Sequence, residues 1–337
     1  MHSPVSVPPI SAAAAGLRVQ VMGEAEAGLL AAVTAAQPAE APDVPRAASP
    51  DPLHQVVAQA RAEASGSQAS AAPLFATLVQ ALRIADLPAP VRAAVAQVLA
   101  LQLPAKGPFT AETVRQAVAQ SGLFLEARLA TGEPAPPDLK AALLTLVRAL
   151  PAAAAREAAP HVATTAPPPV REAALAAQPA TPPALPPAAD APTVVALLRH
   201  EAEQALARQT LHQLASLPDG QTPAWMFEVP IATPQGTTVA QFEIERDARA
   251  PGADSSSDVW RARFSIDVEP LGPVHVHLNL HPDRAAVTVW AERDGSLERL
   301  RAHGEALARE LTADVVFHPG APIRPTPGAG QFVDQTS

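Results

Sequence analysis

The strongest constraint in this sequence is the segment from Trp260 to His281, in which apolar and polar residues alternate on both sides of a Pro-Leu-Gly-Pro connection. Alternation with a period of two is typical of half-buried antiparallel strands. A slip of one residue would move every apolar side chain into water, so the pairing register is well specified. The segment therefore predicts a β-hairpin with one apolar face.

Composition limits where the rest of a core can lie. The 337 residues include 39 prolines, 3 tryptophans, 8 phenylalanines and no tyrosine. Six of these aromatic residues lie between positions 225 and 290, and aromatic side chains supply the largest buried areas. We therefore predict a mostly disordered and α-helical N-terminal part, followed by an α+β C-terminal domain with an antiparallel sheet and one packed helix.

Proline content and periodicity divide the chain into five segments. Residues 1–71 are expected to be a disordered Ala/Pro-rich segment. Residues 72–150 are expected to form a small helical region, because apolar residues recur there at helical spacing. Residues 151–192 contain 11 prolines and are expected to be a linker. The α+β domain would then occupy residues 193–320, and residues 321–337 would be a flexible tail.

Helix and loop signals add detail to this plan. Thr110, Asp138 and Ser296 stand where helix N-caps are expected. A helix is predicted over residues 297–311, with a short strand at 315–317 after it. The Gly-, Ala-, Asp- and Ser-rich stretch from 247 to 258 is expected to be an exposed connection.

Several functional classes are disfavoured by composition. The chain has no cysteine, which excludes disulfides and thiolate metal sites. Its formal net charge of -9, without a basic stripe, argues against nucleic acid as a partner. No stretch approaches the roughly 18 to 20 uninterrupted apolar residues of a membrane span, so we expect no membrane insertion. The prolines and the lack of basic residues before Arg18 argue against a general secretory signal peptide.

Catalytic or metal chemistry has little support in the sequence. His275, His277 and His281 are the one set with metal-ligand character, but an exposed polar strand face explains them more simply. Asp267 and Glu269 share a face and are expected to solubilise the strand end rather than catalyse. Gly-x-Ser-x-Gly and phosphate-cradling Gly-rich motifs are absent. We predict no enzyme, no metal and no cofactor.

One resemblance gives these patterns a function. The corner Leu271-Gly272-Pro273-Val274, the alternating strand after it and the run from Val287 to Arg293 resemble the C-terminal domain of flagellar hook-length control proteins, over roughly residues 222–320. Residues 121–127 and 138–144 are similar to the helical middle region of longer members. The two matches occur in the expected order along the chain.

The resemblance implies an exported molecular ruler. In that family the N-terminal portion passes through the flagellar type III export apparatus and senses the growing hook. The C-terminal domain meets the cytoplasmic domain of the export switch protein and changes the exported substrates from hook-type to filament-type. Hook and hook-cap proteins are further implied partners, and the protein would be cytoplasmic first and extracellular at the hook afterwards. We expect it to act as a monomer. An extended stretch of about 220 residues, at roughly 3.3 Å each, would span on the order of 700 Å.

The candidate site is the corner Leu271, Gly272, Pro273 and Val274, expected to be a structural support for a partner surface, together with Trp290, expected to be exposed. Two alternatives to the flagellar role stay open. One is a non-flagellar structural or adhesive scaffold, and the less favoured one is a metal-dependent enzyme.

Overall fold

The computed structural model describes residues 52–104, 110–132, 137–151, 166–182, 185, 189–218, 223–247, 259–281 and 284–322. Outside these residues lie the first 51 residues of the predicted disordered segment, and residues 152–165, 183–184 and 186–188 of the predicted linker. The 248–258 part of the predicted exposed loop and residues 323–337 of the predicted tail also lie outside them.

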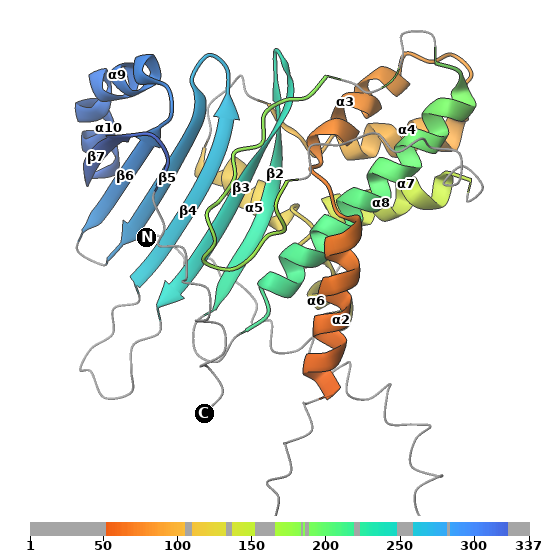
Figure 1. Ribbon diagram of the computed structural model, residues 1–337, viewed down its shortest axis with the longest axis horizontal. Helices are drawn as coiled ribbons and strands as arrows, with labels where there is room; N and C mark the ends of the chain where they lie inside the picture. Colours follow the sequence, from red (N-terminus) through yellow and green to blue (C-terminus); the bar gives the residue numbers. More distant parts are fainter. Residues whose placement is uncertain are drawn as a thin grey trace, which may run out of the picture.

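One mixed sheet organises the described part of the chain (Figure 1), and its strands lie side by side in sequence order. The strands are β1 (Leu103–Pro104), β2 (Ala224–Thr233), β3 (Gly236–Asp247), β4 (Val259–Val268), β5 (Gly272–Leu280), β6 (Ala285–Ala291) and β7 (Ala313–Pro319). Pairing is antiparallel from β2 to β6, whereas β1 and β7 pair in parallel with β2 and β6. The predicted hairpin and the α+β class are confirmed.

Side-chain alternation gives the sheet an apolar face and a polar face. Phe227, Phe242 and Phe264 stand opposite one another on the apolar face, with ring centroids 5.1 and 5.4 Å apart. Val276 and Val289 continue the same row. The neighbouring row on the polar face comprises Glu228, Gln241, Ser265, His275 and Trp290. The two faces therefore differ sharply in chemistry.

The helices before the sheet build a second core. They are α2 (Pro52–Ser67), α3 (Ala72–Ala81), α4 (Ala89–Leu99), α5 (Ala111–Ala119), α6 (Leu125–Thr131), α7 (Leu139–Ala149) and α8 (Ala191–Ala215). Leu78, Val95, Leu146 and Leu198 are completely buried where α3, α4, α7 and α8 meet. Thr110 and Asp138 cap α5 and α7 as predicted, by accepting from backbone N–H groups three residues on.

Two features of this part differ from the predicted segments. Residues 52–67 form helix α2 within the predicted disordered segment, and Pro52 stands at the first residue of the helix, where proline is tolerated. Helix α8 shares its core with α3, α4 and α7, and β1 extends the sheet beside β2. The helical region and the α+β domain are thus one packed body.

A third difference is the strap, residues 166–182, which crosses the polar face in front of β3 and β4 (Figure 1). The backbone N–H groups of Glu172 and Ala176 each donate to a β3 side chain at 3.0 Å, Glu243 and Gln241 respectively. The carbonyl of Gln178 accepts from the backbone N–H of Val239 in β3 at 3.1 Å. Side chains of the sheet satisfy backbone groups that a proline-rich segment cannot pair within itself, so part of the predicted linker is bound to the sheet.

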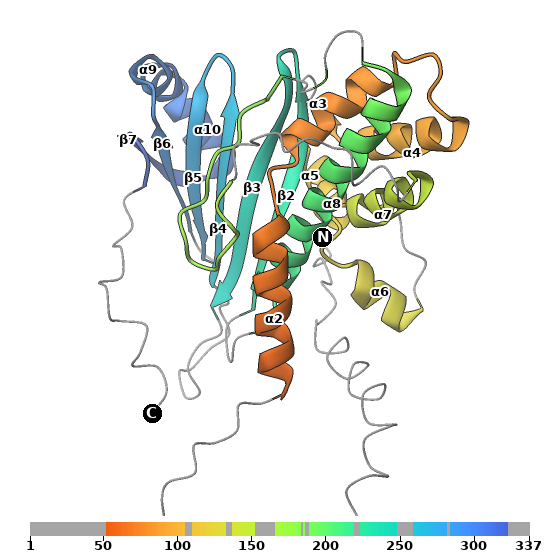
Figure 2. The ribbon, with the colours of Figure 1, turned by 45° about the vertical axis from the view of Figure 1, so that its right-hand side comes forward.

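The apolar face is covered at its two ends by helices (Figure 2). Helix α5 packs over β2, and α9 (Asp294–Ala302) and α10 (Gly304–Leu311) pack over β6 and β7. The single helix predicted over 297–311 is divided at His303, and a Cβ atom on Gly304 would lie 2.7 Å from the ring of Phe317. Among the described residues no helix is both long and apolar enough to cross a membrane.

Candidate functional site

The predicted corner lies where β4 turns into β5 and meets the start of α9. The Leu271 N–H donates to the carbonyl of Val268 at 2.8 Å and closes the turn. The Leu271 carbonyl accepts from the Ser296 hydroxyl at 2.6 Å, so Ser296 bonds the corner instead of capping a helix. The Pro273 carbonyl accepts from the Glu292 N–H at 3.2 Å. The corner is therefore bonded both to the end of β6 and to α9.

Gly272 and Arg293 fix the shape of this corner. Gly272 has φ 70°, and a Cβ there would lie 2.3 Å from Nε of Arg293. The Arg293 guanidinium donates to both carboxylate oxygens of Glu269, at 2.8 and 2.7 Å. Hydrogen bonding within this pair raises the pKa of Arg293 and lowers the pKa of Glu269. Both side chains are about half exposed, so the pair mainly orients the corner. We call Glu269, Gly272, Arg293 and Ser296 the corner clamp.

Trp290 lies on the opposite face of the sheet from Val274. Its ring is partly exposed and lies between the rings of His277 and His318, with centroids 4.6 and 5.6 Å away. Val274 and Gly272 are buried, whereas Leu271 and Pro273 are partly exposed. The structure thus groups the four corner residues but does not bring Trp290 onto the same surface.

Two of the three histidines weighed as metal ligands have other partners. His275 has Nδ1 2.6 Å from the Ser265 hydroxyl and Nε2 2.9 Å from a Glu292 carboxylate oxygen. The ring of His277 packs against the ring of Trp290 at a tilt of 58°, and burial, with help from nearby positive charge, lowers the pKa of His277 to about 4. His281 lies at the end of β5. Across the described ranges no group of three or more His, Cys, Asp or Glu residues is placed to hold a metal ion.

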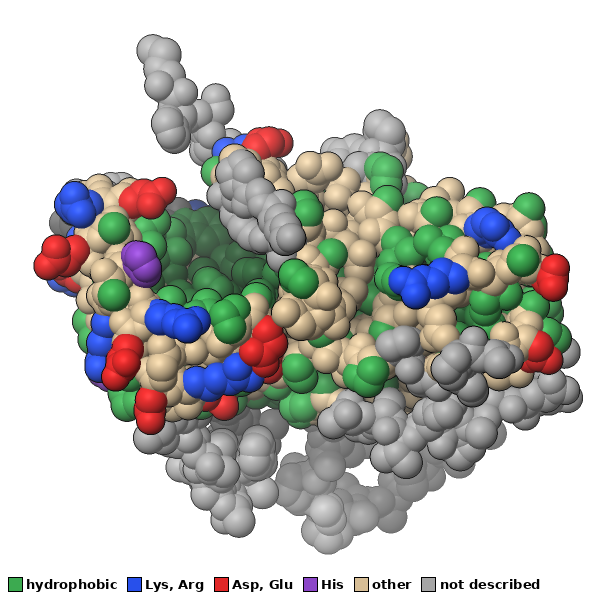
Figure 3. Space-filling model, turned by 90° about the horizontal axis from the view of Figure 1, so that it is seen from above, with side chains coloured by type: hydrophobic (Ala, Val, Ile, Leu, Met, Phe, Trp, Pro, Cys, Tyr) green, Lys and Arg blue, Asp and Glu red, His purple; other side chains and the backbone are tan. Residues whose placement is uncertain are grey.

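An apolar trough crosses the middle of the apolar face, between α5 on one side and α9 and α10 on the other (Figure 3). Under the helices the apolar side chains of the strands are buried: Phe227 is 1% exposed, and Val287 and Val289 are 4% exposed each. Between the helices, part-exposed side chains of β3, β4 and β5 form the trough floor: Phe242, Ile244, Trp260, Phe264, Ile266, Val276, Leu278 and Leu280. No described residue covers this floor fully.

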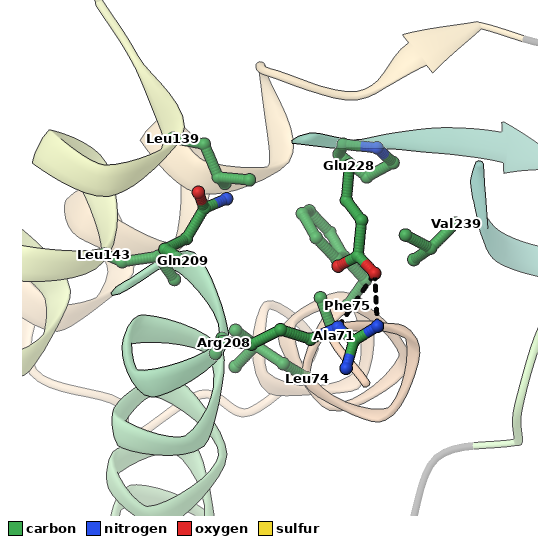
Figure 4. A pocket seen from close by; sticks show the side chains of 11 residues that line it. Ala71, Leu74, Phe75, Leu139, Leu143, Arg208, Gln209, Glu228 and Val239 are labelled. Atoms are coloured by element: carbon green, nitrogen blue, oxygen red, sulfur yellow. Dashed lines mark hydrogen bonds and ion pairs between the residues drawn. The ribbon is translucent and has the colours of Figure 1, made fainter. Parts of the chain in front are cut away.

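A buried charged cluster joins the helices to the polar face. Arg208 of α8 donates through Nε to Glu228 of β2 at 2.8 Å, and Nη2 lies 2.7 Å from the same oxygen (Figure 4). His212 Nε2 is 3.4 Å from that oxygen, and the Gln178 amide of the strap also donates to it. Burial alone would raise the pKa of Glu228, but Arg208 and His212 together hold it below its ordinary range. The carboxylate is therefore kept charged and acts as a structural anchor.

Sequence patterns located the corner but not the trough or the buried cluster. Alternation in β4 and β5 showed which side chains are apolar, yet not which of them a helix covers. Glu228 is the single acid in the otherwise mostly apolar strand β2, a signal that could have pointed to a buried partner.

Comparison with known proteins identifies the C-terminal part. Residues 248–316 match the family model described as flagellar hook-length control protein FliK. No curated protein and no solved structure matches the chain. The matched residues run from the connection before β4 to the middle of β7 and include the corner clamp, α9 and α10. Residues 248–316 are therefore a flagellar hook-length control domain.

Proposed function

We propose that this protein controls the length of the flagellar hook, and that its C-terminal domain switches the flagellar type III export apparatus from hook-type to filament-type substrates. The observation that supports the proposal is the family match over residues 248–316. In this proposal the domain meets the cytoplasmic domain of the export switch protein, while the N-terminal portion meets hook and hook-cap proteins. The protein would act first in the cytoplasm and then be exported to the hook.

The role proposed is that of a regulator without catalysis. The polar groups that cluster on the described sheet are engaged with one another, as in the pairs Arg208–Glu228 and Ser265–His275. Catalytic groups need a substrate within hydrogen-bond reach, and all four of these side chains are buried, Ser265 at 2% and His275 at 5% exposure. The domain therefore fits a binding function better than a chemical one.

The ruler part of the proposal sets a condition on the fold. Helices α3, α5 and α8 contact the sheet and α2 packs on α8, so the residues from Pro52 onward are part of one folded body. The 51 residues before it would span only about 170 Å when extended, against on the order of 700 Å for the first 220 residues. A ruler of the longer reach therefore requires α2 to α8 to unfold during export.

The proposal is tested by measuring hooks in cells that lack this gene. Electron microscopy of purified hook-basal bodies should show abnormally long hooks with few filaments, and a restored copy of the full gene should return hook length to normal. Normal hooks and filaments in the deletion strain would overturn the flagellar role and favour a structural or adhesive scaffold.

A further inference from the structure

We propose that His275 is a proton-dependent latch for the strap, which binds the sheet tightly when the imidazole carries two protons and less tightly when it carries one. The latch is a chain of contacts that begins at the carbonyl of Leu175 in the strap and ends at the carboxylate of Glu292. This inference goes beyond the proposed function and does not depend on it.

The chain of contacts is continuous and mostly buried. The Ser265 hydroxyl of β4 lies 3.2 Å from the Leu175 carbonyl oxygen and 2.6 Å from Nδ1 of His275. Nε2 of His275 lies 2.9 Å from a carboxylate oxygen of Glu292, the residue directly after β6. Ser265 is 2% exposed and His275 is 5% exposed, so bulk water does not supply a missing partner there.

The number of protons decides how many of these contacts are hydrogen bonds. The Leu175 carbonyl and the Glu292 carboxylate only accept, and the Ser265 hydroxyl supplies one proton. A neutral imidazole supplies one more, which makes two protons for three contacts. A doubly protonated imidazole donates from both ring nitrogens, so the Ser265 hydroxyl then donates to the strap.

In the neutral form the contact given up is the one to the strap. The bond from Nε2–H of His275 to the Glu292 carboxylate is charge-assisted and therefore the stronger one. It fixes Nδ1 as an acceptor, which takes the Ser265 proton across the 2.6 Å contact, and the Leu175 carbonyl loses its hydroxyl donor. Closure of the strap and protonation of the imidazole therefore favour each other, so the strap is held more tightly in acid and less tightly as pH rises.

The strands around His275 add further charged and titratable groups. Arg263 of β4 pairs with the buried Glu243 of β3, which compensates its charge. His277 of β5 is uncharged at neutral pH, because burial lowers its pKa to about 4. Burial raises the pKa of Asp267 of β4, and the corner clamp holds an ion pair of its own. Among the described residues, the imidazole of the latch is the titratable group in direct contact with the hydroxyl that reaches the strap.

A second histidine reaches the strap by another route. His212 of α8 lies 3.4 Å from the Glu228 oxygen that also accepts from the Gln178 amide of the strap. The charged side chains of the strap are Arg171, which donates to a carbonyl just after α8, and Glu172, which is exposed. The experiment therefore has to separate the α8 histidine from the latch.

The test measures amide hydrogen exchange of the strap in the full chain at pH 5 and pH 8, expressed as protection relative to the intrinsic exchange rate at each pH. Protection at Glu172 and Ala176 should be about three- to tenfold higher at pH 5, the effect of one hydrogen bond. Ser265→Ala should lower protection at pH 5 and remove most of the difference between the two pH values. Glu292→Gln, at a half-exposed position, should shrink the same difference, because the imidazolium loses its carboxylate. The matched control is His318→Gln, an exposed histidine on the same face, which should keep the full difference.

Nuclear magnetic resonance gives a second readout. Between pH 5 and pH 8 the ring nitrogen shifts of His275 should change from two protonated nitrogens to protonation at Nε2 alone, and the carbonyl carbon shift of Leu175 should change over the same range. An imidazole with one proton at pH 5 would overturn the latch.

Two exchange results would also overturn it. The first is equal protection of the strap at both pH values in the unmodified chain. The second is a pH difference that survives Ser265→Ala, which would assign the effect to His212. Protection of α7 shows whether each variant keeps its fold, and if Ser265→Ala does not, Glu292→Gln and the resonance shifts decide.

Discussion

Replacing Arg208 by methionine tests how the helices are joined to the sheet. Arg208 is 1% exposed and reaches three parts of the molecule. It pairs with Glu228 of β2, and its Nη1 donates to the side chain of Gln68 at 2.6 Å and to the carbonyl of Pro167 in the strap at 3.1 Å. One side chain therefore connects α8 with β2, the segment after α2 and the strap.

The expected loss of unfolding free energy comes from the Glu228 carboxylate, which the substitution leaves buried without its partner. Without the guanidinium, the buried Glu228 carboxylate loses its main compensating charge, and breaking a buried pair in this way costs about 3 to 5 kcal/mol at neutral pH. The folded-state pKa of Glu228 lies below the ordinary value of 4.5, so the stability from the pair is present above pH 4.5 and is lost as pH falls further. In the variant Glu228 can become protonated, so the difference between the two proteins should shrink in acid.

The assay is urea unfolding followed by tryptophan fluorescence at pH 7.5 and pH 4. The double variant Arg208→Met with Glu228→Gln is the control, because it removes both charges and should recover much of the lost free energy of unfolding. A loss below about 1 kcal/mol at pH 7.5, or the same loss at both pH values, would refute the reasoning.

Three further predictions use the same unfolding assay or hydrogen exchange. Burial raises the pKa of Glu201 from 4.5 to about 7, so this group lowers the stability of the fold progressively as pH rises from 4.5 to about 7, and fully above that. Glu201→Gln should stabilise the protein by on the order of 1 to 3 kcal/mol at pH 8 and by little at pH 5, and a gain independent of pH would contradict this. Gly272→Ala should destabilise by about 1 to 3 kcal/mol, because of its positive φ and the contact with Arg293, whereas Gly295→Ala, with open space at its Cβ, should change stability by less than about 0.5 kcal/mol. Leu175→Asp should remove exchange protection from the strap, because Leu175 packs on Met226, and the exposed control Val170→Asp should leave protection intact.

The sheet could be predicted because its information is local. Alternation from Trp260 to Leu280 requires one face to be apolar, and the Leu271–Gly272 turn sets the hairpin, so strands and register followed from neighbouring residues. Thr110 and Asp138 were equally local signals, since an N-cap acts within three residues.

The parts that escaped prediction depend on residues far apart in the chain. The strap is held by β3 side chains about 65 to 71 residues away, a partnership that composition does not encode. Ser296 looked like a helix cap but bonds the corner 25 residues earlier. The trough depends on where α5 and α9 stop, which periodicity within one strand cannot show.

The most direct test of the central claim is to measure which flagellar subunits the cells export. Cells whose only copy of this protein is residues 1–220 are compared with cells that express the full chain at the same level. This truncation removes β2 to β7 and the whole matched domain. The account predicts continued export of hook subunits, abnormally long hooks and no filament subunits in the medium. Normal hooks with filament subunits in the medium would contradict it, because switching would then not need the C-terminal domain.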